Sequence, residues 1–421
     1  MRVQLDYGSD GLSVDLPEER TVVVAPRHSP ALTDPAASLS EALRHPTAGP
    51  PLASLVRAGD RVAISVCDVT RAQPRQLMLE AVFAELPHVT PADVVILVAT
   101  GTHRANTSDE LVAMLGADLV DRYAVVNHDS RDDASLARAG STSSGVPIWL
   151  NRQWLDAAVR ITTGFVEPHF FAGFSGGPKM VAPGLAGLET VLALHDARHV
   201  GHSKATWGIT EGNPIHDDVR EIARLTGVTF AIDVALNRDQ AITQVFAGEL
   251  FAEHAAACAH VKATAMCPVD RLFDVVLTTN SGYPLDQNLY QSIKGMSAAA
   301  CIVKPGGTIL CAAECRDGIP AHGAYGSILR ERGSPAALLE MIETPGYRVP
   351  DGWQVHVQTL IQAKATVLVK AGGLTLDALK AAHFEPVTDV AIAVRGALAS
   401  AGSDATLAVL PHGPQTIPYV R

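Results

Sequence analysis

Hydrophobic and polar positions alternate along the chain in two kinds of segment. Short runs of aliphatic and β-branched residues, such as 61–68 and 93–100, predict buried strands. Longer stretches that mix alanine, leucine and glutamate, such as 75–86 and 107–116, predict helices. Strands that alternate with helices are typical of α/β domains with mostly parallel sheets. Further strands of this series are expected at 124–129, 157–164 and 229–237.

A second series with the same alternation begins near residue 270. It opens with an expected strand at 273–280, a helix at 288–303 and a strand at 306–315. A chain of 421 residues predicts two domains more readily than one. We therefore place an N-terminal α/β domain at 1–268 and a C-terminal α/β domain at 269–421. The pattern continues at 352–362, 365–372 and 405–413.

Composition and charge narrow the class of protein. Hydrophobic residues make up 47% of the chain and charged residues 18%, which is the balance of a globular protein. The net charge of −11 argues against nucleic acid or an anionic membrane surface as the main partner. The first residues lack the apolar core of a signal peptide, and no apolar run approaches the roughly 20 residues that span a bilayer. We therefore expect a soluble cytoplasmic protein.

Polar segments follow several of the predicted strands directly. Ligands bind at the carboxyl ends of the strands in open α/β sheets, so these segments are the first candidates for a site. Residues distant in the sequence meet there because the strands converge. The segments are 68–71, 101–104, 164–170 and 280–284.

Two common nucleotide-binding motifs are absent from the sequence. No two glycines are separated by a single residue, so the GxGxxG fingerprint of a dinucleotide site is missing. A Walker A loop fails at 173–180, where Pro178 separates glycine from lysine and Met180 replaces the hydroxyl residue that binds magnesium. Amides of this loop remain suited to cradling a phosphate as part of another kind of site.

A lysine stands in unusual surroundings within the segment PHFFAGFSGGPKMVAPG, residues 168–184. Lys179 follows Gly176 and Gly177, whose small size predicts a backbone that approaches a ligand closely. His169 lies ten residues before this lysine and His195 sixteen residues after it. A lysine that only keeps a surface soluble does not need such neighbours.

Histidines supply the remaining candidate chemistry. His103 directly follows a predicted strand, and His169 lies beside two phenylalanines. Two imidazoles that face one cavity suit a reaction that removes a proton on one face of a substrate and returns it on the other. His195 and His199 are four residues apart, so they share a face if the segment is helical, and this spacing can chelate zinc. A helix end is the plainer explanation for these two, as a structural role is for a lone histidine.

Three further side chains are suited to holding an anion. Arg71 either pairs with an acid such as Asp68 or grips a carboxylate or phosphate with its guanidinium. Gln291 and Lys294 lie three residues apart on one face of the predicted helix 288–303, which equally fits a solvated helix flank.

The order and spacing of five segments resemble the nickel-dependent lactate racemase family. This resemblance covers nearly the whole chain and implies a nickel pincer nucleotide, Ni(II)-pyridinium-3,5-bisthiocarboxylate mononucleotide, bound covalently through Lys179. It implies His195 as the nickel ligand, which suits the planar geometry of Ni(II). Residues Asp68, Val69, Thr70 and Arg71 would bind the cofactor. The five segments are DVTR at 68–71, GTHR at 101–104, PHFFAGFSGGPKM at 168–180, His195, and YQSIK at 290–294.

The same resemblance implies a reaction and a substrate site. The chain would be a racemase or epimerase of a 2-hydroxy acid, lactate-like or larger, that works by reversible hydride transfer to the cofactor. His103 and His169 would be the acid/base pair. The active-site cleft would lie between the two domains, and separate maturation enzymes would make the cofactor. Binding of the substrate would fall to Arg71, Tyr290, Gln291 and Lys294.

Two other functions stay open at this point. A zinc-dependent hydrolase would use His195 and His199, although no HExxH segment supplies its general base. A non-catalytic protein would keep the fold and hold a carboxylate or nucleotide without turnover. Retention of both His103 and His169 favours the racemase over this second alternative.

Overall fold

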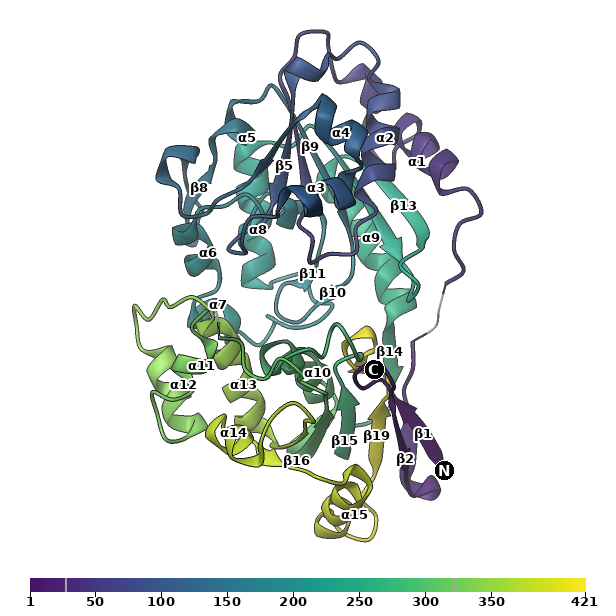
Figure 1. Cartoon of the computed structure of the whole chain (residues 1–421), viewed down its shortest axis with the longest axis vertical. Coiled ribbons are helices and arrows are strands. Elements are labelled where there is room, and N and C mark those ends of the chain that lie inside the picture. Colours follow the sequence, from purple (N-terminus) through teal and green to yellow (C-terminus); the bar gives the residue numbers. More distant parts are fainter. Residues whose placement is uncertain (27–28, 322) are drawn as a thin grey trace. The chain divides into compact units, whose positions relative to one another are not determined.

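The computed structural model describes residues 1–26, 29–321 and 323–421, and the chain forms two compact units (Figure 1). The central unit comprises His28–His195 and Gly208–Lys262. The terminal unit comprises Met1–Arg27, Asp196–Trp207 and Ala263–Arg421, and therefore holds both ends of the chain. In the described ranges, no helix is long and apolar enough to cross a membrane.

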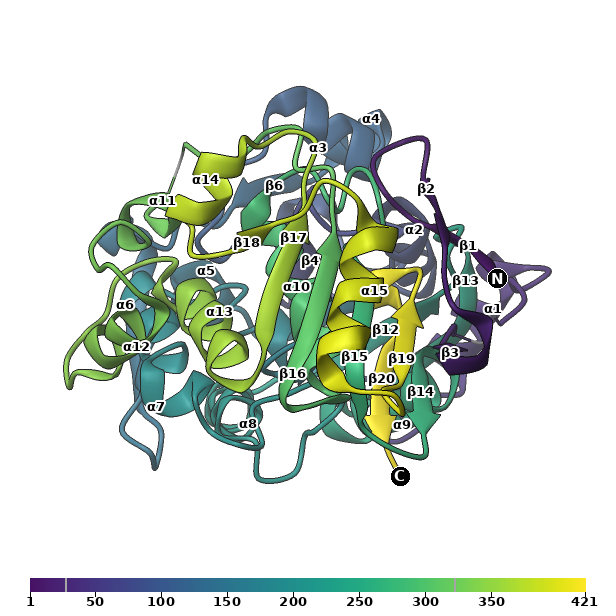
Figure 2. The ribbon, with the colours of Figure 1, turned by 90° about the horizontal axis from the view of Figure 1, so that it is seen from below.

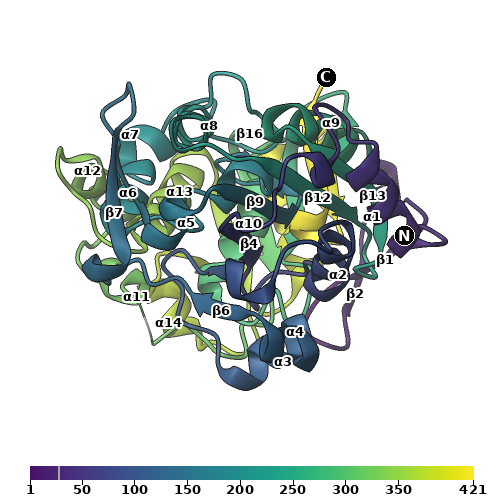
Figure 3. The same cartoon turned by 90° about the horizontal axis from the view of Figure 1, so that it is seen from above.

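The central unit is built on a six-stranded sheet in the order β13-β12-β9-β4-β5-β6, and Figure 3 labels β13, β12, β9, β4 and β6. All neighbouring strands are parallel except β13, which runs antiparallel to β12. Every residue of β4 is buried, as expected for a parallel strand covered on both faces. The strands are β4 (Val62–Cys67), β5 (Val94–Ala99), β6 (Ala124–Asn127), β9 (Val159–Phe165), β12 (Phe230–Leu236) and β13 (Ile242–Gly248).

Helices and short hairpins complete the central unit. Successive residues of β4 point to opposite faces, so Ile64 joins one hydrophobic core and Ala63 joins the other. The helices are α1 (Pro35–Arg44), α2 (Arg75–Glu85), α3 (Ser108–Leu115), α4 (Ala117–Arg122), α5 (Arg152–Asp156), α6 (Leu188–Leu194), α8 (Pro214–Thr226) and α9 (Leu250–Ala265). The hairpins are β7 (Leu136–Ser141) with β8 (Pro147–Asn151), and β10 (Pro168–His169) with β11 (Gly173–Phe174).

The terminal unit is built on a second six-stranded sheet, with all strands parallel in the order β18-β17-β16-β15-β19-β3. Helix α15 packs against β15 and β16 (Figure 2), and its apolar residues share a core with the hairpin β1–β2. The sheet strands are β3 (Thr21–Val23), β15 (Phe273–Thr279), β16 (Val303–Ala312), β17 (Thr366–Lys370), β18 (Glu385–Pro386) and β19 (Leu407–Leu410).

The remaining elements of the terminal unit are helices and two strand pairs. The helices are α7 (Ala197–Val200), α10 (Leu289–Ala300), α11 (Tyr325–Ile328), α12 (Pro335–Glu343), α13 (Gly352–Lys364), α14 (Leu376–Ala381) and α15 (Val390–Ala401). The strand pairs are β1 (Arg2–Leu5) with β2 (Leu12–Asp15), and β14 (Met266–Val269) with β20 (Ile417–Val420).

The two units differ in extent from the domains expected at 1–268 and 269–421. Residues 1–27, 196–207 and 263–268 belong to the terminal unit, although they were expected in the N-terminal domain. The physical reason for the first segment is strand pairing, because β3 forms the edge of the terminal sheet beside β19. The two α/β architectures with mostly parallel sheets are as expected.

Candidate active site

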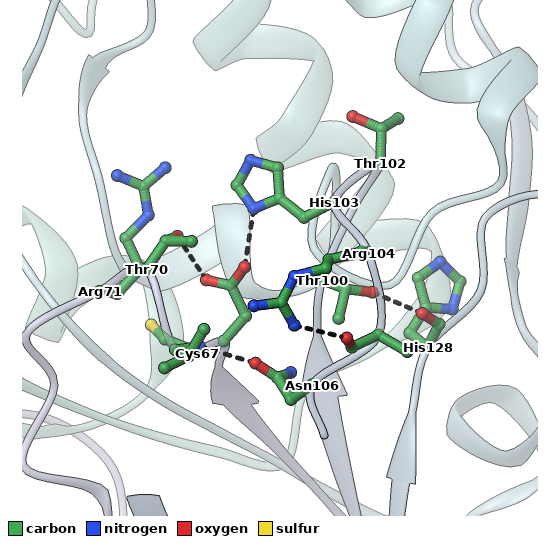
Figure 4. A network of polar contacts seen from close by, with 12 residues as sticks. Cys67, Thr70, Arg71, Thr100, Thr102, His103, Arg104, Asn106 and His128 are labelled. Atoms are coloured by element: carbon green, nitrogen blue, oxygen red, sulfur yellow. Dashed lines mark hydrogen bonds and ion pairs between the residues drawn. The ribbon is translucent and has the colours of Figure 1, made fainter. Parts of the chain in front are cut away.

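Asp68 and His103 meet at the carboxyl ends of β4 and β5, and Figure 4 shows His103 beside the loop that carries Thr70 and Arg71. His103 Nδ1 lies 2.7 Å from Asp68 Oδ2, and the Thr70 hydroxyl donates to Asp68 Oδ1 at 2.7 Å. A buried carboxylate beside Nδ1 fixes the proton on that nitrogen, so Nε2 carries the lone pair. The His103 side chain is 48% exposed, whereas that of Asp68 is 4% exposed. The imidazole is therefore held by a buried acid and offers a proton acceptor outward.

The electrostatics of Asp68 agree with this assignment. Burial raises the pKa of Asp68, but the hydrogen bond and charge of His103, together with the Thr70 hydroxyl, outweigh burial and hold that pKa below its usual value. Asp68 and Thr70 were expected to bind a cofactor. In the structure the Thr70 hydroxyl bonds to Asp68, and Asp68 bonds to His103, so this pair also orients the imidazole.

Arg75 and Gln73 hold the 68–71 loop in place, and sequence reasoning missed both. The buried guanidinium of Arg75 donates to the carbonyls of Cys67, Asp68, Arg71 and Gln73. The Gln73 side chain accepts from the Cys67 amide at 2.7 Å and donates to the Thr163 hydroxyl at 2.7 Å. The only available signal was that both polar residues follow the predicted strand at 61–68.

Two asparagines tie the neighbouring loops together. Asn106 Oδ1 accepts from the Val69 amide at 3.0 Å. Asn127 Oδ1 in turn accepts from the Asn106 side chain at 2.8 Å and from its backbone amide at 3.0 Å. The loops that follow β4 and β5 are therefore fixed to each other and to the end of β6. This rigidity keeps Asp68 and His103 in register.

Two arginines in the same region differ in their partners. Arg104 forms a bidentate ion pair with Glu110, with distances of 2.8 and 2.6 Å. Within the described ranges, the guanidinium of Arg71 forms neither an ion pair nor a hydrogen bond, and it projects from its loop on the same side as His103 (Figure 4). Arg71 is therefore the better placed of the two to hold an anionic ligand.

His169 is held differently from His103. It pairs with Gly173 in the β10–β11 hairpin, and the Ala172 amide donates to its Nδ1 at 3.2 Å. Since Nδ1 accepts a hydrogen bond, the neutral ring carries its proton on Nε2. His169 thus offers a donor at Nε2, whereas His103 offers an acceptor.

His195 is the C-cap of α6 and lies near the same aromatic group as His169. Its Nδ1 donates to the Val191 carbonyl at 2.7 Å, so the lone pair is on Nε2. Metal-bound histidines commonly use their second nitrogen in this way. The Phe171 ring lies 4.6 Å from the ring of His169 and 5.1 Å from that of His195. Phe171 therefore packs against both imidazoles.

The segment that carries Lys179 lies against the ends of β4 and β5. The short helix η5 (Gly177–Met180) contains the half-buried Lys179. The Ser65 hydroxyl on β4 donates to the Met180 carbonyl at 2.9 Å, and the Gly101 amide donates to the Gly184 carbonyl at 3.0 Å. The Lys179 segment and the His103 loop are thus joined by hydrogen bonds.

The glycines before Lys179 leave room for buried side chains beneath their loop. Gly176 and Gly177 have φ values of +71° and +48°, in the left-handed region that favours glycine. A Cβ on Gly177 would lie 2.4 Å from the His254 ring, and one on Gly176 would lie 2.9 Å from Asp233. These glycines were expected to let the backbone approach a ligand closely. A Cβ at either position would instead meet buried side chains beneath the loop.

The expected zinc pair, His195 and His199, requires one continuous helix, which the structure does not form there. Helix α6 ends at Leu194, and Asp196 caps the separate helix α7, so His195 and His199 do not share a helical face. His199 is buried, with Nδ1 2.7 Å from Asp196 Oδ1. Among the residues that the structure describes, no three His, Cys, Asp or Glu side chains are grouped to hold a metal ion. This donor set argues against the zinc hydrolase.

The residues expected to bind a substrate carboxylate lie on α10 of the terminal unit. The Asn288 side chain accepts from the Gln291 amide at 3.0 Å and begins the helix. Gln291 and Lys294 are half-buried and one helical turn apart, as expected. Tyr290 packs edge-on against Tyr325, with ring centroids 5.4 Å apart. Binding of a carboxylate by these residues stays a prediction.

Comparison with known sequences gives full-length matches. One family model, the lactate racemase N-terminal domain, matches residues 7–208, and another, the lactate racemase C-terminal domain, matches residues 270–417. A lactate racemase from Thermoanaerobacterium thermosaccharolyticum is 32% identical over 424 residues, which cover 99% of this chain and 98% of that protein. A lactate racemase from Lactiplantibacillus plantarum is 35% identical over 378 residues, which cover 89% of each.

Comparison with solved structures gives the same picture. The lactate racemase apoprotein from T. thermosaccharolyticum superposes with a TM-score of 0.93 at 32% identity, with all of both chains covered. A crystal structure of a protein from Thermotoga maritima has a TM-score of 0.68 at 17% identity and covers 94% of this chain. The second match shows a shared fold alone.

Proposed function

The chain belongs to the lactate racemase family, and we propose that it inverts the carbon that bears the hydroxyl group of a 2-hydroxy acid, lactate-like or larger. Membership confirms the resemblance seen in the sequence and the expectation of an isomerase. One observation carries the proposal for this chain. His103 is preset as a proton acceptor by Asp68, while His169 is preset as a donor by the Ala172 amide.

His103 and His169 have different roles in proton transfer. His103 Nε2 accepts the proton of the substrate hydroxyl, and the nearby Asp68 carboxylate stabilises the imidazolium that forms. His169 acts as the acid on the other side in its imidazolium form, with a proton on each nitrogen, and gives the Nε2 proton to the substrate oxygen. This leaves a neutral ring with its proton on Nδ1 and a lone pair on Nε2, which accepts a proton in the reverse direction. Protonation of Nδ1 gives up the 3.2 Å hydrogen bond from Ala172.

The residues present fit a nickel pincer nucleotide. His195 has its lone pair on Nε2, which suits a metal ligand, and Lys179 provides an amine on a segment fixed to the ends of β4 and β5. These two residues would hold the group, with the 68–71 loop beside it. When bound, the group accepts and returns a hydride at the carbon that is inverted. Maturation enzymes would make it and attach it to Lys179.

Anion binding is assigned to Arg71 in the central unit and to Tyr290, Gln291 and Lys294 on α10. The guanidinium of Arg71 suits a carboxylate through two parallel hydrogen bonds. Lys294 offers a single charge, and Gln291 offers an amide. Orientation of the carboxylate would decide which face of the substrate carbon is presented.

The test uses chain matured with the cofactor-making enzymes and a panel of chiral 2-hydroxy acids. Intact-protein mass spectrometry first establishes the mass addition on Lys179, and loss of optical purity is then followed by polarimetry. We expect at least one acid to racemise, and His103→Gln and His169→Gln each to abolish it at equal loading. Loaded protein that inverts none of the acids would refute the proposal.

A further inference from the structure

Two buried carboxyls face each other beneath the Lys179 segment. Asp233 on β12 is 1% exposed and Glu253 on α9 is 0% exposed. The two side chains interact electrostatically, and Asp233 Oδ1 and both Glu253 oxygens have no hydrogen-bond donor in the described part of the chain. Burial raises the pKa of Asp233 to about 6 and that of Glu253 well above its usual range. Two such groups share one proton, because a buried pair of negative charges is strongly unfavourable.

The carboxyl pair and its neighbour His254 hold the loop before Lys179. Asp233 Oδ2 accepts from the Gly177 amide at 2.7 Å. His254, next to Glu253 on α9, has Nε2 2.8 Å from the Ser175 carbonyl. The loop 175–177 is therefore bonded at two points, from a strand and from a helix. Its glycines are required because Asp233 and His254 fill the space where their Cβ atoms would lie.

Burial and nearby positive charges keep the two histidines beside the carboxyl pair, His216 and His254, neutral. The His216 ring of α8 stacks on that of His254 at 5.7 Å. Burial, with the positive charges of Arg220 and Lys179, lowers the pKa of His254 to about 4. Burial, the neighbouring His254 and the same two charges lower the pKa of His216 to about 3. A neutral His254 carries a proton on Nε2 and donates it to the Ser175 carbonyl. His254 is therefore always the donor in this hydrogen bond at neutral pH.

We propose that Asp233, Glu253 and His254 are positioning residues that fix the loop 175–177 and thereby place Lys179 for covalent attachment of the cofactor. The inference rests on the proposed function, since that function makes Lys179 the attachment point. Glu253 acts through Asp233, because its shared proton leaves Asp233 Oδ2 charged toward the Gly177 amide. A charged acceptor makes a stronger hydrogen bond than a neutral one.

A matched pair of double variants tests the carboxyl pair. Asp233→Asn with Glu253→Gln keeps an acceptor for the Gly177 amide and needs no shared proton. Asp233→Ala with Glu253→Gln removes that acceptor without leaving a lone buried carboxyl. We expect the alanine pair to raise hydrogen exchange in peptides of residues 175–184 about tenfold in the unloaded chain, and to lower Lys179 loading by a similar factor. The asparagine pair should lie between the alanine pair and wild type in both, because it keeps the acceptor but loses its charge.

A second pair of variants, at His254, tests the same positioning role if the alanine variant does not fold. His254→Gln keeps a donor for the Ser175 carbonyl, and His254→Leu removes it. We expect His254→Leu, at a melting temperature equal to that of His254→Gln, to show faster loop exchange and lower loading. Equal loading and equal loop exchange within both pairs would overturn the inference. A wild-type chain that never gains mass on Lys179 would instead refute the proposed attachment, while loop exchange in the unloaded chain still decides the positioning role.

Discussion

Asp68 decides which nitrogen of His103 is able to accept a proton. Its carboxylate is buried and bonded to Nδ1, so the nitrogen left to accept a proton is Nε2. The sequence identified both residues as candidates because they follow predicted strands. It could not pair them, since they are 35 positions apart and only the parallel register of β4 and β5 brings their loops together.

Asp68→Asn should lower kcat by roughly 100- to 10,000-fold at equal Lys179 loading, because the amide neither fixes the tautomer nor stabilises the imidazolium. Racemisation rates of the matured variant and wild type measure this. Thr70→Val serves as the control, since it removes one hydrogen bond to Asp68 and keeps the charge. A kcat for Asp68→Asn within about threefold of wild type would remove Asp68 from the mechanism.

Lys294→Ala should weaken binding of the acid by about 2–3 kcal/mol if its ammonium pairs with the carboxylate in a desolvated site. Calorimetric titration of a non-reacting 2-hydroxy acid analogue into loaded protein measures the affinity. Lys304→Ala is the control, because Lys304 also lies in the terminal unit and pairs with Asp274 on the surface. Unchanged affinity in Lys294→Ala would move the carboxylate to other residues.

Elements with a strong local pattern were predictable. The strands at 61–68, 93–100 and 273–280 and the helix at 288–303 appear as β4, β5, β15 and α10. The segment 352–362 is apolar enough for either element type and forms the helix α13. The break between α6 and α7 was not foreseen, because it depends on the Asp196 side chain bonding to the His199 amide.

The carboxyl pair formed by Asp233 on β12 and Glu253 on α9 makes the stability of the fold depend on pH. Folded-state pKa values of Asp233 and Glu253 lie above their usual ones, so the folded chain binds more protons and its stability falls as pH rises from about 4 through 6 and beyond. Glu253→Gln should flatten this slope, as measured by urea midpoints at about pH 5 and pH 8. A slope equal to that of wild type would contradict the shared proton. Other ionisable groups near the pair are Glu249, His254, Cys258, His216, Arg220 and Lys179.

At the level of the whole molecule, the sequence predicted two α/β architectures but not their true extents. Strand β3 has only three residues, and its partner β19 lies almost 400 positions later, so no local pattern reveals the pairing. The hairpin β1–β2 is hidden for the same reason, since its apolar residues pack on α15. Position along the chain was a poor guide to membership of a unit.

Leu5→Ala should lower the unfolding free energy of the terminal unit by about 2–5 kcal/mol, because Leu5 is fully buried in the core shared with α15. Chemical denaturation followed by far-UV circular dichroism measures the change. Arg2→Ala, which removes an exposed pair with Asp15, should leave the midpoint nearly unchanged. Equal midpoints for Leu5→Ala and wild type would show that the hairpin does not support this core.

The insertion of the central unit into the terminal one has a consequence for synthesis on the ribosome. Strand β3 is synthesised before the central unit, whereas β19, the strand it pairs with, is synthesised after it. All of the central sheet leaves the exit tunnel in between and has every strand it needs to fold. Strand β3 therefore waits until the central unit has been made before its sheet can close, and the half of the protein that carries Lys179 is complete first.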